Sequence, residues 1–429
     1  MGQSSIKVLI VNTYDVGGAA NSCIRLHLGL LNNNVKSKLL VKQKFKNYKY
    51  VYSFIKSVET GLFSRIVAIS FKMLKKIEIF NFFFKNKNEF FLKNRDKRLE
   101  LFSFPNSKYD ITSSPLYEKA DIINLHWVAG FLDYKSFFKK NTKPVVWTLH
   151  DMNPFSGGEH YNETLFNLGN DYKPMNRVVS VIEKKIINKN IKIKKKALKK
   201  IDNLTIVTPS KWLMEEAKKS ALFKNRNVFL IPYGLDVSIY NPKNQIDSRK
   251  YFSIPNDKKV VLFVAHSINN NRKGFSFLKA ALEKYNKSDI LLCYIGKVVS
   301  PFVGLNNTLY LGEIKDDKIM SLAYSAADVF VIPSLMDNLP NTVLESLLCG
   351  TPVIGFAVGG IPEMISHNEN GLLADNISVE SLLKTINIFF KEGVVKSRGE
   401  ISYDAIKKYD KNIQAKRYMK LFENILEQI

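Results

Sequence analysis

Residues 331–363 have the sequence VIPSLMDNLPNTVLESLLCGTPVIGFAVGGIPE, which holds the clearest structural pattern in the chain. It predicts a buried strand, a polar loop, a helix from about Asn341 to Gly350, and a second apolar strand. Open α/β sheets hold phosphates where a loop leaves a strand and enters a helix, because free backbone N–H groups and the helix dipole point at the anion. The stretch therefore predicts a ligand-binding turn in an α/β domain.

Two acidic side chains bracket this turn. Asp337 lies in the loop, and Glu345 lies one helical turn beyond Asn341 and Thr342 on the same helix face. The two carboxylates can therefore reach opposite ends of a ligand held over the helix start. Considered singly, each feature has an ordinary explanation, since Glu345 would complement the helix dipole and the later pair Gly359–Gly360 would form a simple turn.

Composition limits the class of protein. A chain of 429 residues suits two domains of roughly 200 residues each, and 45% apolar residues are enough to build packed cores. The net charge of +25 requires an anionic partner, either a nucleic acid, a phosphate-bearing substrate or an acidic membrane face. Three widely separated cysteines indicate neither a metal site nor a disulfide framework, which fits a reducing cytoplasm. We expect no signal peptide and no membrane-spanning helix, since no apolar run approaches about 18 residues.

The first half begins with an apolar run at 6–11, which predicts a buried parallel strand. The loop after it contains Gly17 and Gly18, and it is either a ligand-binding loop or a plain strand-to-helix turn. Two further strands end in His126–Trp127 and in His150–Asp151. Because the carboxyl ends of parallel strands form the crevice of such a sheet, we expect these side chains near a ligand.

The second half begins with a strand at 259–265, followed by a turn in which Arg272 and Lys273 can neutralise a pyrophosphate. Further strands are expected at 290–296 and 308–311, and the final segment has helical periodicity. Two halves of alternating strands and helices predict an α/β fold of two facing Rossmann-like domains with a cleft between them.

Two segments are unusually basic. Apolar residues at a spacing of three and four predict an amphipathic helix over 62–84, which is either packed on a core or interfacial. Residues 183–200 hold nine lysines interleaved with isoleucines. This pattern indicates either a solvated helix face or a docking face for anionic lipid headgroups or a polyphosphate carrier.

The pairing of Asp337 with Glu345 eight residues later resembles the paired-acid motif of retaining glycosyltransferases of family 4. That motif continues, as here, with Cys-Gly-Thr-Pro-Val and Gly-Gly-Ile-Pro-Glu. The first acid is Asp337 where most of that family has Glu. Lys273–Gly274 matches the family's Lys-Gly, and 311–313 resembles its base-binding loop. The segment 148–161 resembles the subgroup that makes bacterial surface polysaccharides such as colanic acid, capsule and O-antigen.

This resemblance implies a GT-B fold, with an acceptor-binding domain at 1–235, a nucleotide-sugar-binding domain at 236–410, and a final helix at 411–429 packed back on the first domain. It implies retaining transfer of a hexosyl group from a nucleotide diphosphate sugar to a hydroxyl of a glycan acceptor, which we expect to be lipid-linked. No metal or other cofactor is expected. The expected location is the cytoplasm, peripheral on the inner face of the cell membrane, with an anionic membrane surface as a partner and no nucleic acid.

The resemblance also assigns roles to single residues. Catalytic roles fall to His150, Asp337 and Glu345, and Glu345 is also expected to bind the donor ribose. The other expected donor-binding residues are Gly17, Gly18, Arg272, Lys273, Gly312, Asn338, Leu339, Pro340, Asn341 and Thr342. The expected acceptor-binding residues are Asn12, His126, Trp127 and Asp151.

Two other functions fit parts of the sequence. A nucleotide-sugar epimerase or hydrolase would share the two-domain architecture, and it would form an epimer or free sugar without an acceptor. A non-catalytic protein would use its basic surface to bind a membrane or a nucleic acid, and its nucleic-acid binding would be sensitive to salt. The sequence shows no aromatic–basic nucleic-acid module in support of the second function.

Overall fold

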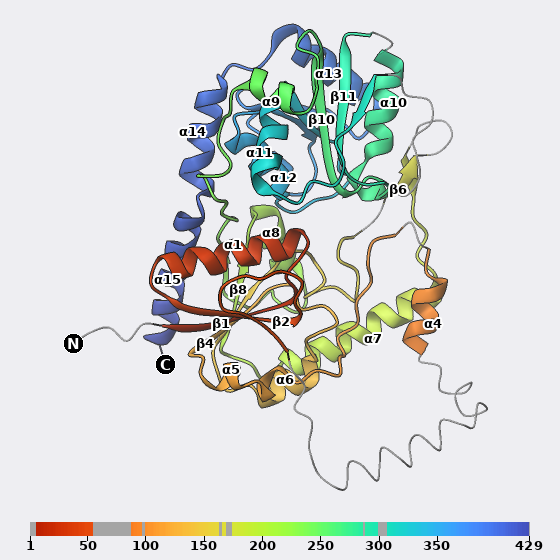
Figure 1. The fold of residues 1–429 in the computed structure, drawn as a ribbon. Coiled ribbons are helices and arrows are strands. Elements are labelled where there is room, and N and C mark those ends of the chain that lie inside the picture. The colour runs from red at the N-terminus through yellow and green to blue at the C-terminus, as the bar shows by residue number, and fades with distance from the viewer. Residues whose placement is uncertain are drawn as a thin grey trace, which may run out of the picture.

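The computed structural model describes residues 6–54, 87–96, 99–162, 165–168, 174–285, 288–298 and 307–428. These residues form two α/β halves, and the chain passes from the first half to the second and then back (Figure 1). The amphipathic helix expected at 62–84 lies outside the described residues. Among the helices of these ranges, none is both long enough and apolar enough to cross a membrane.

The first half is built on a seven-stranded sheet in the order β3-β2-β1-β4-β5-β8-β9, in which every pair of neighbours is parallel. The strands are β1 (Lys7–Tyr14), β2 (Lys36–Gln43), β3 (Val51–Ser53), β4 (Ile122–Leu125), β5 (Val145–Thr148), β8 (Leu204–Thr208) and β9 (Val228–Leu230). An antiparallel hairpin, β6 (Leu165–Leu168) and β7 (Pro174–Asn176), stands apart from this sheet.

Helices cover both faces of the first sheet, which is why its strands are apolar on both sides. They are α1 (Gly18–Asn32), α5 (Pro115–Glu118), α6 (Tyr134–Lys140), α7 (Val181–Leu198) and α8 (Lys211–Lys219), with α4 (Lys87–Asn94) beside α7. Along β1, Val8 and Ile10 pack in the cluster that contains α1 side chains. Leu9 and Val11 pack in the cluster that contains side chains of α6, α7 and α8.

The second half repeats this architecture with a six-stranded sheet in the order β12-β11-β10-β13-β14-β15, also parallel throughout. The strands are β10 (Lys259–Ser267), β11 (Ile290–Lys297), β12 (Thr308–Tyr310), β13 (Val329–Ile332), β14 (Val353–Phe356) and β15 (Gly371–Ala374). The helices are α9 (Gln245–Tyr251), α10 (Phe275–Tyr285), α11 (Asp317–Ala326), α12 (Asn341–Leu348), α13 (Val379–Glu392) and α14 (Arg398–Tyr409). Alternating residues of β10 again enter two separate cores, one on each face.

The last helix, α15 (Lys411–Leu426), returns to the first half and packs against α1, so that α14 and α15 run along one side of both halves (Figure 1). Gly29 of α1 lies at this contact, because a Cβ at that position would be 2.9 Å from the backbone oxygen of Lys411. The hydroxyl of Tyr418 lies 2.8 Å from the Thr148 hydroxyl at the end of β5. The C-terminal helix is therefore bonded to the sheet of the first half.

The predicted α/β fold of two Rossmann-like domains is confirmed by these two sheets. Helix α12 begins at Asn341, and Gly350 behind it has a φ of +73°, the left-handed conformation that ends many helices. The β6–β7 hairpin was not predicted from the sequence.

Candidate active site

The two halves meet at the N-termini of α1 and α12. Asn341, the first residue of α12, donates from Nδ2 to the Gly18 backbone oxygen at 3.1 Å and to the Ser22 hydroxyl at 3.0 Å. Gly17 has a φ of +103°, a conformation that other residues rarely adopt. No atom lies within 4 Å of a Cβ built at Gly17 or Gly18. The glycine loop therefore leaves open space beside the start of α12.

Glu345 of α12 is buried between the two halves. Its Oε1 lies 3.0 Å from Nη2 of Arg25, which belongs to α1, and its Oε2 accepts from the Tyr324 hydroxyl at 3.1 Å. Burial opposes the charge on Arg25, but Glu345 and neighbouring groups hold the pKa of this guanidinium above its ordinary value. The ion pair thus joins the paired-acid motif to the first half.

Arg272 and Lys273 lie in a short 3-10 turn, η2 (Asn271–Lys273), that follows β10. Lys273 Nζ is 2.6 Å from Asp337 Oδ2, and Arg272 Nη1 is 3.3 Å from Asp337 Oδ1. The turn comes this close because residue 274 is glycine, where a Cβ would lie 1.8 Å from the Pro333 backbone oxygen. Burial raises the pKa of Asp337, but Lys273 and Arg272 outweigh burial and hold this pKa below its ordinary value. The three charges form one cluster at the carboxyl edge of the second sheet.

Glu100 of the first half completes this cluster. Its Oε1 accepts from Arg272 Nε at 2.6 Å and from Asn270 Nδ2 at 2.9 Å. Burial raises the pKa of Glu100, but Arg272 and the two hydrogen bonds hold it below the ordinary value. The Arg272 guanidinium also lies over the Tyr161 ring, 4.4 Å from its centre. Both cations expected to bind phosphate are therefore already paired with carboxylates of the chain.

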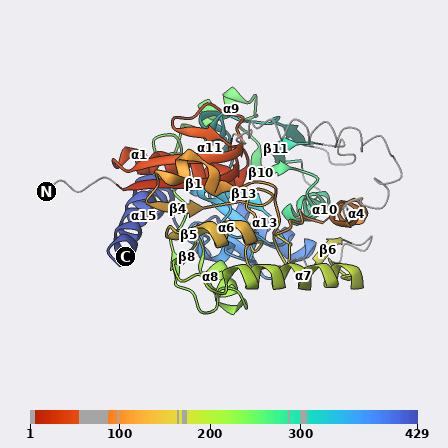
Figure 2. The same cartoon turned by 90° about the horizontal axis from the view of Figure 1, so that it is seen from below.

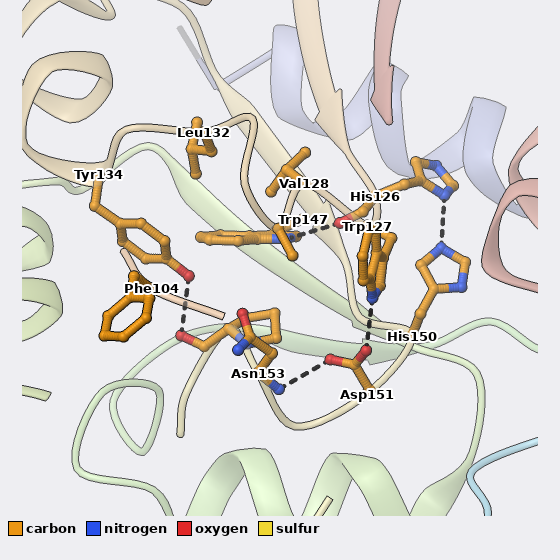
Figure 3. Close-up of a pocket in the computed structure, with 12 residues that line it drawn as sticks. Phe104, His126, Trp127, Val128, Leu132, Tyr134, Trp147, His150, Asp151 and Asn153 are labelled. Atoms are coloured by element: carbon orange, nitrogen blue, oxygen red, sulfur yellow. Dashed lines mark hydrogen bonds between the residues drawn. The ribbon is translucent and has the colours of Figure 1, made fainter. Parts of the chain in front are cut away.

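His126 and His150 lie at the carboxyl ends of β4 and β5 and point toward one another (Figure 3). His126 Nε2 is 2.9 Å from Asn124 Oδ1, whose own amide nitrogen donates to Val146 and Thr148. Because Asn124 Oδ1 can only accept, His126 Nε2 carries the proton and His126 Nδ1 must accept.

The rest of this chain of hydrogen bonds then follows. His150 Nε2 donates to His126 Nδ1 at 2.9 Å, and the Tyr233 hydroxyl donates to His150 Nδ1 at 2.7 Å. Burial lowers the pKa of His150 to about 4, and it lowers that of His126 well below the ordinary value. Both imidazoles are therefore neutral at pH 7, and both nitrogens of His150 have partners within the protein.

The candidate acceptor residues lie next to these histidines. Trp127 Nε1 donates to Asp151 Oδ2 at 2.8 Å (Figure 3), and His160 Nδ1 is 2.6 Å from the same oxygen. Burial raises the pKa of Asp151, but His160 and the hydrogen bonds hold it below its ordinary value. Asn12 accepts from the Trp127 backbone N–H at 2.8 Å. A small cavity, lined in part by His126, Trp127, His150 and Asp151, opens beside this group.

The remaining candidate donor-binding residues lie in different surroundings. Asn338 bridges the halves, because its Oδ1 accepts from the Ser210 hydroxyl at 2.5 Å and its Nδ2 donates to the His150 backbone oxygen at 3.1 Å. Leu339 is buried in the core of the second half, Pro340 precedes α12, and Thr342 is half-buried at its start. Gly312 lies at the carboxyl edge of the second sheet. Its backbone oxygen accepts from the Gly296 N–H rather than from another candidate residue.

Two members of this site, Arg25 and Glu100, were not predicted from the sequence. Arg25 had a weak signal, since it is a charged residue within the apolar run of α1. Glu100 had no sequence signal, because it belongs to no motif and its partner Arg272 is 172 positions away in the chain. Among the described residues, no group of three or more His, Cys, Asp or Glu side chains is placed to hold a metal ion. The expectation of metal-independent chemistry stays a prediction.

The fold of the two halves is that of GT-B glycosyltransferases. The crystal structure of Anabaena HepE in complex with UDP and glucose superimposes with a TM-score of 0.64 over 97% of this chain and 99% of that one, at 14% identity. Residues 244–408 match the family described as glycosyl transferases group 1. This part of the chain, which contains Arg272, Lys273, Asp337 and Glu345, is therefore a group 1 glycosyltransferase domain.

Curated relatives match over a shorter span. The putative teichuronic acid biosynthesis glycosyltransferase TuaC of Bacillus subtilis is 25% identical, over 44% of this chain and 48% of that protein. The N,N'-diacetylbacillosaminyl-diphospho-undecaprenol alpha-1,3-N-acetylgalactosaminyltransferase of Campylobacter jejuni is 28% identical, over 40% of this chain and 47% of that protein. The chain spans about half the length of the curated relatives it matches.

Proposed function

We propose that the chain is a retaining glycosyltransferase that transfers a hexosyl group from a nucleotide diphosphate sugar to a hydroxyl of a glycan. The observation that carries this proposal is the cluster of Arg272, Lys273 and Asp337 at the carboxyl edge of the second sheet, next to the N-terminus of α12 and opposite the open loop at Gly17 and Gly18. This arrangement offers two cations and a helix start to a diphosphate.

Breaking the glycosyl–phosphate bond leaves negative charge on the departing diphosphate. Arg272, Lys273 and the start of α12 would stabilise that charge, with the diphosphate replacing Glu100 and Asp337 as their partner. Glu345 would accept hydrogen bonds from the ribose hydroxyls, and Asp337, once released, would bind hydroxyls of the sugar. For retention, a donor phosphate oxygen would take the acceptor proton on the front face, so that no side chain is assigned as general base.

The relatives support the finer parts of the proposal by their names. HepE was crystallised with UDP and glucose, which supports a nucleotide-sugar donor. TuaC is named for teichuronic acid biosynthesis, and the Campylobacter enzyme for a diphospho-undecaprenol acceptor. We therefore propose a lipid-linked acceptor of surface polysaccharide biosynthesis, entering beside Trp127 and Asp151.

We further propose that α7 holds the protein on the inner face of an anionic membrane. All described lysines of 183–200 except Lys194 are exposed, while Glu183 is buried. Val181 and Ile182, at the start of the helix, are each 68% exposed. The helix lies on the side of the first half that faces away from the second half (Figure 1). Exposed lysines beside exposed apolar side chains suit a surface of anionic headgroups.

Calorimetric binding against UDP-, GDP-, ADP- and dTDP-sugars and their free diphosphates, with and without EDTA, tests the proposal. One selective donor whose binding does not change with EDTA is expected. Release of free sugar or an epimer from that donor without an acceptor would instead favour a hydrolase or an epimerase. Absence of binding across the panel would contradict the proposed function.

A further inference from the structure

Helix α8 of the first half begins against the second half. The first N–H groups of a helix have no partner within it. Here the Lys211 N–H donates to Glu363 Oε2 at 2.7 Å, and the Trp212 N–H donates to Glu363 Oε1 at 2.7 Å. Glu363 belongs to the second half, at the end of the 3-10 turn η3 (Ile361–Glu363). Its carboxylate therefore binds the positive end of a helix in the other half.

The start of α8 also contacts the loop that holds Asp337 and Asn338. Ser210, the N-cap residue of α8, accepts from the Leu213 N–H at 3.1 Å and donates to Asn338 Oδ1 at 2.5 Å. Asn338 in turn donates to the His150 backbone oxygen at 3.1 Å. The first turn of α8 therefore forms hydrogen bonds with both Glu363 and Asn338.

The turn that carries Glu363 packs directly on that loop. A Cβ at Gly359 would lie 1.8 Å from the Asp337 backbone oxygen, and one at Gly360 would lie 1.9 Å from the Asn338 backbone oxygen. The Gly360 N–H donates to the Asp337 backbone oxygen at 3.0 Å. There is no room for a side chain between the two backbones. A displacement of this turn must therefore displace the Asp337 loop as well.

We propose that Glu363 is a positioning residue, which holds the two halves together at α8 and thereby fixes the loop of Asp337 and Asn338 against His150. A cap within one half would stabilise that half alone. Because Glu363 and α8 belong to different halves, their hydrogen bonds exist only when the halves are together. Glu363 is itself exposed, so that its removal leaves no buried group unpaired within its own half.

The test compares Glu363→Ala with Glu369→Ala in the full chain. Glu369 is an exposed acid of the same half that pairs within it, 2.7 Å from Lys396, and Lys396 keeps Asp404 as a second partner at 2.9 Å. Small-angle X-ray scattering, with and without UDP, should show a larger radius of gyration for Glu363→Ala alone. This readout needs no activity, so that it stands even if the proposed function fails.

The kinetic part of the test rests on the proposed function. Glu363→Ala should raise the donor KM about fivefold, the factor that a contact of N-cap strength carries. Glu363→Gln, which keeps one oxygen as an acceptor, should restore part of the loss. Equal radii of gyration for the two alanine variants, or faster hydrogen exchange confined to 211–219 with an unchanged radius, would overturn the proposal and leave Glu363 as a local helix cap.

Discussion

Lys194 of α7 is fully buried, where its Nζ donates to the backbone oxygens of Asn153 and Ser156 and lies 5.1 Å from the centre of the Tyr134 ring. Burial lowers the pKa of Lys194 to about 7, although Asp151 acts in the opposite direction. The unfolded chain has the ordinary lysine value of about 10.4. Between these two pH values the unfolded state binds the extra proton, so the contribution of Lys194 to stability grows as pH rises and is lost as pH falls.

Lys194→Met removes this titration. We expect the parent protein to gain stability relative to Lys194→Met by about 1.4 kcal/mol for each pH unit between roughly 7 and 10. Urea unfolding at several pH values measures the difference. The exposed Lys192→Met on the same helix is the control, and equal pH slopes for the two variants would refute the assignment.

Substitution of Lys273 tests whether this residue binds the phosphates of the donor. Loss of one charged hydrogen bond to a phosphate costs about 1.5–3 kcal/mol. Lys273→Ala should therefore weaken binding of the donor found in the panel by about tenfold to a hundredfold. The control is Lys284→Ala, which removes an exposed lysine paired with Glu380 in the same half. Calorimetry in which both variants bind like the parent would show that Lys273 does not bind the phosphates.

Site residues were predictable where they belong to a local motif, and not where the fold brings them together. Asp337 and Glu345 lie in one short stretch whose spacing already places them around one turn, and Lys273 lies in a second short stretch, in the turn η2 after β10. Arg25 and Glu100 reach the same site from the first half, and nothing local in the sequence couples them to their partners across 320 and 172 positions. The neutral state of His150 likewise depends on burial, which a sequence does not show.

At the scale of elements, α7 is the clearest case in which the sequence left two functions open. Its lysines fit either a solvated face or a docking face, and six of the seven lysines within α7 are exposed while Lys194 is not. The exposed Val181 and Ile182 add an apolar edge that a purely solvated helix would lack.

Binding to vesicles distinguishes these functions. A variant with Lys184, Lys185, Lys189 and Lys192 changed to Gln should lose most of its co-sedimentation with anionic vesicles at low salt, since each lysine near the surface contributes about 1 kcal/mol. The matched control changes Lys407, Lys408, Lys416 and Lys420 of α14 and α15, which are also exposed. Equal loss in both variants, or equal binding of the parent to neutral vesicles, would contradict docking through α7.

The elements themselves were predictable where their pattern is strong. Buried strands such as β1 and β13 read as continuous apolar runs, and the start of α12 was predicted at its observed residue. The β6–β7 hairpin was not predicted, because its strands are short and belong to neither main sheet. Strand β6 lies against η2 of the other half, a contact that its own periodicity does not predict.

At the scale of the whole molecule, three of the contacts that join the described parts of the two halves lie around the candidate site and involve a charged side chain. Arg25 meets Glu345, Glu100 meets Arg272, and Glu363 meets the start of α8. Each contact pairs a charge of one half with a group of the other, and two of them use residues that we assign to the donor. We therefore expect binding of the donor to be coupled to the arrangement of the two halves.

Hydrogen–deuterium exchange of the full chain, with and without the nucleotide sugar selected by the calorimetric panel, tests whether the donor binds between the two halves. A donor bound between the halves should slow exchange together in three segments, at 15–21, 267–275 and 333–341, which contain the starts of α1, α10 and α12. The first segment lies in the first half and the other two lie in the second half, so a ligand between the halves would protect all three. Slower exchange in one half alone, or elsewhere in the chain while binding persists, would show that the donor does not bind between the halves.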